Sequence, residues 1–344
     1  MKAVILEKIG KYAVTDRPMP QIKESHDLLV RVDACSICGS DLHILSDPPG
    51  YPAKEGVILG HEMVGTVIKK GENAAGFQVG DRVVCDNNIP CGRCYFCRSG
   101  KANMCENVMC LGVDGDGFFA QYSRIPDFAA VKISEDLPLD IAIFAEPLNC
   151  VMSGLDKIRI LPGETAVVIG AGPIGLYFAY LLKYNGAGKV IVAEQSETRR
   201  NFALEMGADM AVKPEEEQII FDDTAGRGAD VVIDTAGCCL PEAVRWVRSS
   251  GRILLFGQNF AAQQNLCQSY ITRKELTIFG SYIGTYSWHD TVKFLETKPE
   301  VLKKMITHRL SLEEFQVGYE AMKNKTALEV ILYPNRKGEF DESI

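Results

Sequence analysis

A glycine-rich turn between a strand pattern and a helix pattern is the feature that most limits how this chain can fold. Residues 166–169 form a short apolar run, Gly170-Ala-Gly172-Pro-Ile-Gly175 follows, and a helical apolar pattern continues to Leu182. This is the context that the G-x-G-x-x-G fingerprint of dinucleotide-binding folds requires. The stretch 165–182 is uncharged and approaches membrane-spanning length, but its glycines and proline favour a strand, turn and helix.

Each position of this fingerprint has a physical role. Gly170 permits the tight turn, Gly172 lets a pyrophosphate approach the backbone, and Gly175 lets the helix pack closely on the strand. Free N–H groups at the start of the helix, which begins near Pro173 and Ile174, face the phosphates. These five residues are therefore the predicted core of a dinucleotide site.

Glu194 provides information about the type of dinucleotide. It ends the next predicted strand, 189–193, nineteen residues after Gly175. A carboxylate there accepts hydrogen bonds from the ribose hydroxyls and repels a 2′-phosphate, so NAD is favoured over NADP. Arg199 and Arg200 weaken this preference, although we interpret them mainly as solvated residues of a predicted helix, 197–206. Arg199 is retained as a candidate cofactor contact.

Strands and helices continue to alternate after this point. The later patterns predict strands at 210–213, 230–234, 252–256 and 275–279, and helices at 214–224 and 240–248. Strands separated by helices at this spacing predict a parallel sheet with helices on both faces. From about Gly284 the pattern leaves the sheet. Helices at 290–296 and 312–323 and a strand at 328–333 are then expected to pack back onto the N-terminal part, with His289 and His308 in loops.

The N-terminal part of the chain reads as a β-rich domain. Residues 1–35 contain short alternating runs separated by Gly10, Pro18 and Pro20, which predict a small antiparallel unit. Residues 57–70 and 81–85 predict further strands. Phe118 and Phe119, after a glycine turn, are expected in the core.

Four cysteines crowd into fifteen residues with the spacing C-x2-C-x2-C-x7-C: Cys91, Cys94, Cys97 and Cys105. Two intervening residues let a turn aim neighbouring sulfurs at one metal ion, and four thiolates around zinc leave no position for substrate. An iron–sulfur cluster also uses four thiolates, but this spacing fits neither common ferredoxin pattern. We therefore predict a structural zinc that holds a loop with little core of its own.

A second group of metal-binding residue types lies between residues 35 and 62. Cys38, His43, His61 and Glu62 offer the thiolate, imidazole and carboxylate ligands that a catalytic zinc takes while keeping one position open for water or substrate. Any one of them alone would be read as an ordinary buried residue, and the combination favours a metal site. Glu146, which follows an apolar run over 137–144, is uninformative by itself.

Composition excludes several classes of function. The net charge of −8 and the pI near 5.3 argue against nucleic acid or an anionic membrane as a partner. A chain of 344 residues allows about two domains. No signal peptide is expected, because the apolar run after Lys2 is broken at Glu7, and we predict a cytoplasmic protein.

Twelve cysteines without an export signal indicate metal or catalytic use rather than disulfides. Those outside the two metal groups are expected in the core: Cys35, Cys85, Cys110, Cys150 and Cys267. The adjacent Cys238 and Cys239 follow a predicted strand near the expected cofactor, and an unreactive role is favoured over a redox role for them.

These motifs occur in an order that resembles the zinc-dependent medium-chain alcohol dehydrogenases, specifically the sorbitol (polyol) and threonine dehydrogenase branch. The resemblance rests on Cys38-Gly-Ser-Asp with His43, Gly60-His-Glu62, the four-cysteine loop, Glu146-Pro-Leu and the fingerprint at Gly170, and it covers essentially the whole chain. It implies an α/β fold in which a Rossmann doubly wound parallel sheet is inserted in a GroES-like β-rich catalytic domain.

The resemblance also implies domain boundaries and an assembly. Residues 1–150 would form the GroES-like catalytic domain with the zinc sites, residues 151–284 the Rossmann NAD-binding domain, and residues 285–344 a segment that completes the catalytic domain. The catalytic zinc would lie in the cleft between domains, and the protein would be a homodimer or homotetramer.

Site residues can be carried over from the family motif by motif. Cys38 and His61 resemble ligands of the catalytic zinc, with Glu62 as a third ligand and Glu146 at the family's variable fourth position. Ser40 and His43 resemble its proton relay. Zn²⁺ with one thiolate, one neutral imidazole and one carboxylate is neutral, and a second carboxylate would make it a poorer Lewis acid. We therefore expect the two glutamates to exchange with water and substrate.

The implied function is a zinc-dependent oxidoreductase with two zinc ions per chain, one catalytic and one structural. It would transfer hydride from a secondary alcohol, such as a polyol, sugar alcohol or related sugar derivative, to NAD. Two departures make sorbitol itself doubtful as substrate: Asn149 and Cys150 replace small apolar residues, and Ser281-Tyr-Ile-Gly stands where related sorbitol dehydrogenases often carry an arginine. The alternatives are an NADPH-dependent aldehyde or ketone reductase, a polyol-phosphate dehydrogenase, and a cofactor-binding structural protein.

Overall fold

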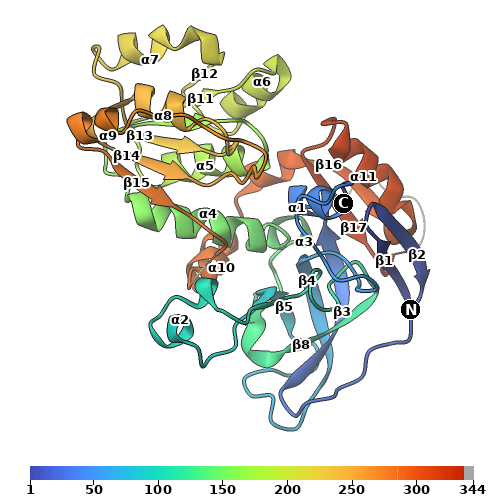
Figure 1. The fold of residues 1–344 in the computed structure, drawn as a ribbon. Helices are drawn as coiled ribbons and strands as arrows, with labels where there is room; N and C mark the ends of the chain where they lie inside the picture. Colours follow the sequence, from blue (N-terminus) through green and yellow to red (C-terminus); the bar gives the residue numbers. More distant parts are fainter. Residues whose placement is uncertain (285, 337–344) are drawn as a thin grey trace. The chain divides into compact units, whose positions relative to one another are not determined.

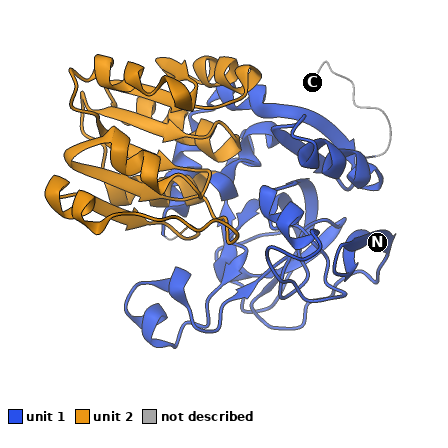
Figure 2. Cartoon of the chain, turned by 45° about the horizontal axis from the view of Figure 1, so that its top comes forward, with its two compact units in different colours: residues 1–147, 285–344 blue, residues 148–284 orange. Residues whose placement is uncertain are grey.

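The computed structural model describes residues 1–284 and 286–336. They form two compact units: unit 1 contains residues 1–147 and the segment from 286 onward, and unit 2 contains residues 148–284 (Figure 2). Within the described residues, no helix is both long and apolar enough to cross a membrane.

Unit 1 is built on a seven-stranded sheet in the order β16-β17-β3-β4-β5-β9, with β8 also paired to β3 (Figure 1). Neighbouring strands are antiparallel except β16 and β17, which are parallel. The strands are β3 (Asp27–Ser36), β4 (Glu62–Lys70), β5 (Arg82–Cys85), β8 (Tyr122–Pro126), β9 (Ala130–Lys132), β16 (Ile306–Ser311) and β17 (Glu329–Tyr333).

Strand β3 lies in the middle of this sheet: one face carries the buried apolar residues Leu28, Val30, Val32 and Ala34, while the other face also carries Arg31 and Asp33, which are not buried. It pairs with β4 on one side, where Ser36 lies opposite Glu62. On the other side it pairs with β17, where Ile331 lies opposite Ser36. The end of the chain is thereby joined to the strand that leads into Cys38.

Smaller elements complete unit 1. Strands β1 (Lys2–Lys8) and β2 (Lys11–Asp16) form an antiparallel pair, as do β6 (Asn88–Ile89) and β7 (Met109–Cys110). The helices are α1 (Gly39–Ile44), α2 (Tyr95–Arg98), α3 (Leu139–Ala142), α10 (Trp288–Glu296) and α11 (Phe315–Lys323), and α4 (Ala145–Ile158) begins here and continues into unit 2. Short 3-10 helices are η1 (Ala102–Met104), η2 (Asp127–Ala129), η4 (Glu300–Met305) and η5 (Leu312–Glu314).

Phe118 and Phe119 lie in the core cluster of unit 1, as predicted.

Unit 2 contains a six-stranded parallel sheet in the order β12-β11-β10-β13-β14-β15. Its strands are β10 (Thr165–Ile169), β11 (Lys189–Ala193), β12 (Met210–Val212), β13 (Ala229–Asp234), β14 (Val247–Leu255) and β15 (Thr277–Gly280). The strand order reverses between β10 and β13, which is the place where doubly wound sheets bind ligands. The predicted parallel sheet and α/β fold class are confirmed.

Helices cover both faces of this sheet. Val167 and Ile169 pack in a cluster with residues of α7 (Gln218–Asp223) and α8 (Leu240–Trp246). The intervening Ala166 and Val168 are also fully buried and point the other way, so the strands carry apolar residues on both faces. The other helices of unit 2 are α5 (Pro173–Tyr184), α6 (Glu197–Glu205), α9 (Gln268–Lys274) and the 3-10 helix η3 (Pro214–Glu216).

Several element boundaries differ from the sequence prediction. The strand predicted from residue 57 begins only at Glu62, because Gly60 has a positive φ of 86° that interrupts extended backbone. The helix predicted to residue 248 ends at Trp246, because Val247 already pairs with Ala229 in the sheet. His289 and His308, predicted in loops, lie on α10 and β16.

We predict that Gly175→Ala destabilises unit 2 by about 3 kcal/mol, since overpacked sites with no room to relax cost this much. An ideal Cβ at Gly175 would lie 2.0 Å from the Gly170 carbonyl oxygen, which is backbone. Gly172→Ala is the matched control, because its Cβ would meet no atom within 4 Å, and we expect a loss of less than about 1 kcal/mol. Denaturant unfolding of both variants measures the difference, and equal midpoints would contradict the packing role of Gly175.

Candidate functional site

Cys38 is positioned by the start of helix α1. It is the N-cap residue, and its backbone N–H donates to Asp41 Oδ2 at 3.0 Å. Strand β3 ends at Ser36, only two residues before Cys38. The pairing of β3 in the sheet therefore fixes the position of the Cys38 thiol. The Cys38 side chain remains half-buried.

His61 and Glu62 come to the same place through a turn at Gly60. The φ of Gly60 is 86°, and a Cβ there would lie 2.3 Å from the ring of Phe119, so only glycine fits. Glu62 is the first residue of β4 and is 2% exposed. The turn thus places an imidazole and a carboxylate side by side at the end of the sheet.

The ligand atoms of Cys38, His61 and Glu62 all lie within 4.8 Å of one another. Glu62 Oε2 accepts a hydrogen bond from Ser36 Oγ, and Glu62 Oε1 lies 3.9 Å from His61 Nε2. His61 Nδ1 lies 3.6 Å from Asp41 Oδ1, a fully buried oxygen with no hydrogen-bond partner. A metal-bound histidine characteristically donates its second ring N–H to such a carboxylate, so this donor set fits a zinc ion.

The charges at this group favour a bound cation. Burial raises the pKa of Glu62 well above its ordinary value, and the negative charges of Cys38 and Glu329 raise this pKa further. Burial lowers the pKa of His61, but Asp41 and Cys38 outweigh it, so the pKa is raised well above normal. Without a cation the group therefore retains protons, and metal binding must displace them. Metal affinity should accordingly rise with pH.

The other predicted residues of this site are placed around the group rather than in it. Glu146 is half-buried in the first turn of α4, and its charge acts on Glu62, but it is not among the ligand atoms within 4.8 Å. Ser40 Oγ lies 3.3 Å from His61 Nε2, whereas His43 is exposed three residues further along α1. The structure thus gives Ser40 a hydrogen bond to His61 and not to His43.

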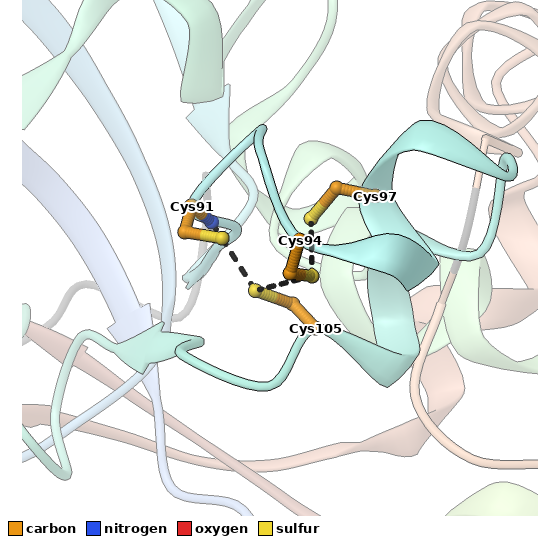
Figure 3. A group of neighbouring side chains, drawn as sticks. All are labelled: Cys91, Cys94, Cys97 and Cys105. Atoms are coloured by element: carbon orange, nitrogen blue, oxygen red, sulfur yellow. Dashed lines mark hydrogen bonds between the residues drawn. The ribbon is translucent and has the colours of Figure 1, made fainter.

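The four-cysteine group is assembled from one short segment (Figure 3). Cys94 Sγ lies 3.5 Å from Cys97 Sγ and 3.9 Å from Cys105 Sγ, while the Cys91 N–H donates to Cys105 Sγ at 3.2 Å. Helix α2, which carries Cys97, has no buried residue. The sulfurs therefore converge in a segment that lacks apolar packing to hold it.

The thiols of this group compete for ionisation. Backbone N–H groups of Arg93 and Cys94 lower the pKa of Cys91 to about 6. Burial and the neighbouring thiols raise the pKa of Cys97 to about 12. Crowded thiols cannot all ionise without a counter-charge, and a divalent cation would supply one. The donor set fits a closed four-thiolate zinc.

The glycine loop, residues 170–175, has the geometry that the fingerprint predicts. Gly170 has a φ of 98°, and Gly172 caps α5 with Pro173 in the first turn. Glu194 follows β11, and its Oε2 accepts the Ala171 N–H at 2.8 Å while Oε1 accepts the Ser196 N–H at 2.8 Å. The Glu194 carboxylate thus faces the loop in which phosphates are expected.

Comparison with known proteins identifies the family. Residues 24–135 match the model described as "Alcohol dehydrogenase GroES-like domain", and residues 173–297 match "Zinc-binding dehydrogenase". The chain is 32% identical to D-arabinitol dehydrogenase 1 of Uromyces fabae, over 97% of each chain. It is 34% identical to L-threonine 3-dehydrogenase of Caldanaerobacter subterraneus, over 93% of this chain and 95% of that protein.

The chain is a zinc-dependent medium-chain alcohol dehydrogenase of the sorbitol and threonine dehydrogenase branch. Its fold is that of the family: a zinc-binding dehydrogenase from Sinorhizobium meliloti 1021, solved with bound NADP, superposes with a TM-score of 0.90 at 31% identity, over 97% of this chain and 99% of that one.

Three residues of this dehydrogenase that line the Cys38 group were not found from the sequence. Asp41 faces His61, Ser36 donates to Glu62, and Glu329 raises the pKa of Glu62 through its charge. Asp41 lies in the quoted Cys-Gly-Ser-Asp motif, and its spacing of three residues from Cys38 matches the capping box. Ser36 and Glu329 carry no local signal, because strand register alone brings them near the site.

The remaining cysteine predictions have mixed outcomes. Cys35, Cys85 and Cys110 are buried, as predicted. Cys150 is only half-buried, and the prediction for Cys267 is wrong, because it is exposed just before α9 and contacts Ser269 Oγ at 3.1 Å. A single cysteine in a polar stretch carries no periodic pattern, so its sequence gave no basis for placing it in the core.

We predict that the two metal groups respond differently to mutation. Cys94→Ser and Cys38→Ser should each reduce the zinc content from two ions per chain to one. Cys94→Ser alone should also make residues 91–105 sensitive to proteolysis, because little besides the metal holds this segment. Metal analysis and limited proteolysis of the two variants measure this. Equal protease resistance in both would contradict a structural role for the four-cysteine group.

Proposed function

We propose that this protein oxidises a secondary alcohol, such as a polyol or sugar alcohol, with NAD as hydride acceptor and zinc as Lewis acid. The observation that supports this most directly is the convergence of Cys38, His61 and Glu62 within 4.8 Å in a zinc-binding dehydrogenase. The glycine loop and Glu194 in unit 2 support the cofactor part of the proposal.

The residues around the proposed zinc have two roles: some would bind the metal, and others orient the side chains that bind it. Zinc held by Cys38, His61 and Glu62 would lower the pKa of the substrate hydroxyl and stabilise its anion. Asp41 orients the His61 imidazole from behind, and Ser36 orients the Glu62 carboxylate. The nicotinamide ring supplies the acceptor for the hydride.

The proton follows a path along helix α1. Ser40, whose hydroxyl lies 3.3 Å from His61 Nε2, would take up the proton that the alcohol loses and release its own hydroxyl proton in the same step. His43 lies one turn further along the same helix and is exposed, so it can pass the proton to solvent. The absence of a direct Ser40–His43 hydrogen bond means that a substrate, cofactor hydroxyl or water must bridge them.

We propose NAD rather than NADP because Glu194 presents a carboxylate at the end of β11. Arg200 does not offset it, since its guanidinium donates to the carbonyl groups of Glu194 and Gln195. Arg199 is half-buried, and within residues 1–284 and 286–336 its guanidinium makes no hydrogen bond or ion pair. NADPH-dependent reduction of an aldehyde or ketone is therefore the alternative function. Turnover rates measured with NAD(H) and with NADP(H) at equal concentration distinguish the two functions.

The charge around the Cys38 group favours a substrate that is not anionic. Glu329 begins β17, and continuing the register of β17 with β3 brings it opposite Cys38; the Ile37 N–H donates to the Val330 carbonyl at 3.0 Å. Glu329 is 6% exposed, and its charge, like the charges of Cys38 and Glu146, raises the pKa of Glu62, so negative charge gathers at this group. A phosphorylated polyol would be repelled here.

A second candidate substrate class is an amino alcohol. The L-threonine 3-dehydrogenase of Caldanaerobacter subterraneus is 34% identical to this chain, and an ammonium group would be attracted by the same three glutamates. A panel of polyols, sugar acids, polyol phosphates and L-threonine, followed by NADH absorbance, distinguishes the two classes.

We expect Cys38→Ser and His61→Ala to lose at least about a thousandfold in turnover, because each removes a ligand of the proposed catalytic zinc. NAD binding should be retained, since the glycine loop is unchanged. Turnover, zinc content and NAD binding are measured on the same samples. Wild-type turnover in a variant that has verifiably lost this zinc would overturn the proposed function, and lost NAD binding would point to misfolding.

Glu329→Gln should relax the discrimination against anionic substrates. Two unit charges 10 Å apart interact by about 1.7 kcal/mol at an effective dielectric constant of about 20, so the ratio of kcat/KM for a polyol phosphate to that for the free polyol should rise about tenfold or more. Glu300→Gln on the exposed surface is the control. An unchanged ratio in Glu329→Gln would show that this carboxylate does not face the substrate.

A further inference from the structure

Two adjacent cysteines in the loop between strand β13 and helix α8 form a sulfur pair that the proposed function does not use. Cys238 Sγ and Cys239 Sγ lie 3.8 Å apart, and both side chains are half-buried. The sulfur separations recorded in the four-cysteine group are 3.5 and 3.9 Å. Two metal–sulfur bonds of about 2.3 Å at a tetrahedral angle also separate sulfurs by about 3.8 Å. The pair can therefore present both sulfurs to a single atom.

The backbone around this pair is fixed by a buried carboxylate. Asp234 is 2% exposed, and its Oδ1 accepts the N–H groups of Ala236 and Gly237 at 2.9 Å each. Its Oδ2 accepts the Cys239 N–H, also at 2.9 Å. Since the loop is already ordered, a ligand that bridges the two sulfurs loses little entropy in ordering it.

The pair also lies beside the proposed dinucleotide site within unit 2. Thr235 Oγ1, in the same loop, donates to the Ile169 carbonyl at 2.7 Å, directly before the glycine loop. Strands β10 and β13 are the neighbours between which the strand order reverses, so both loops border the crevice where such sheets bind nucleotides. An occupant of the sulfur pair would share that crevice.

The donor count limits what the pair can bind. Among the described residues, the groups of three or more metal-binding side chains are the two already discussed, and neither includes this pair. Asp234 offers no third ligand, because its oxygens accept backbone N–H groups. The pair therefore lacks the donors to bind an ion that needs four protein ligands. A trivalent arsenic atom that carries one organic group needs only two more bonds.

The protonation of Cys239 points to the same class of ligand. Burial, together with the charge of Asp234, raises the pKa of Cys239 to about 12, so this thiol keeps its proton at neutral pH. A ligand that carries an oxide can remove such protons as water, whereas a bare cation must compete with them.

We propose that Cys238 and Cys239 form a two-sulfur site for monosubstituted trivalent arsenicals, and that an occupied site excludes the dinucleotide; the second part rests on the proposed NAD site. With an organoarsenic oxide, the arsenic–oxygen double bond breaks and two arsenic–sulfur bonds form. The two thiol protons leave with the oxygen as one water molecule. Arsenic stays trivalent, and nothing is oxidised or reduced.

The test uses phenylarsine oxide on the zinc-loaded full-length protein, with adducts counted by native mass spectrometry. Wild type should take up one phenylarsenic group per chain at stoichiometric dose. Cys238→Ser and Cys239→Ser should each abolish this adduct, because one thiol cannot chelate. Cys267→Ser is the matched control, since it removes an exposed single thiol, and it should react like wild type. Adduct formation that persists in both Cys238→Ser and Cys239→Ser overturns the site.

Competition with the dinucleotide is measured separately. NAD at 100 times its dissociation constant should weaken adduct formation about 100-fold, and by the same exclusion a chain that carries the adduct should not bind NAD. Gly172→Ala serves as the second control: it should form the adduct normally but lose the protection by NAD. Adduct formation unaffected by saturating NAD, in wild type that demonstrably binds NAD, overturns the exclusion. Wild type that binds no dinucleotide instead overturns the proposed function.

Discussion

The register in which strand β3 pairs with β4 and β17 is the constraint on which the Cys38 group depends. Ser36 lies opposite Glu62 on β4 and opposite Ile331 on β17, so three separate parts of the chain end at one point of the sheet. Since side chains alternate between the faces of a strand, a slip of one residue in either pairing would turn Glu62 or Glu329 to the wrong face. The metal group is thus a property of the sheet as a whole rather than of the loops that carry its ligands.

In unit 2, the sheet likewise fixes the positions of the loops that form the candidate dinucleotide site. Its central strands are buried on both faces, and this fixes the positions at which β10, β11 and β13 end. The glycine loop, Glu194 and the loop after Asp234 all follow such strand ends and are joined by hydrogen bonds. A rigid sheet can therefore carry loops whose N–H groups are oriented before any ligand arrives.

Much of this organisation could be predicted from the sequence where the signal is local. The spacing of Cys91, Cys94, Cys97 and Cys105 and the fingerprint from Gly170 to Gly175 each lie within a few residues, so their geometry follows from short stretches of backbone. Glu329 could not be found in this way. Its place beside Cys38 follows from a strand pairing between opposite ends of the chain, which no local pattern records. The start of β4 at Glu62 could not be predicted either, although here the cause is local. The apolar run from residue 57 favours a strand, but Gly60, with its positive φ, interrupts it.

The hydrogen bond between Ser36 and Glu62 has a consequence for how the site could move. Ser36 holds Glu62 Oε2, and Oε1 is the oxygen near His61, so Oε1 could withdraw from a cation while Oε2 stays bonded to the serine. The buried carboxylate is never left without a partner, so stepping away from the metal costs less than it would for an unsupported acid. If Glu62 is a zinc ligand, as proposed, its hydrogen bond to Ser36 would allow it to leave the metal while an alcohol binds.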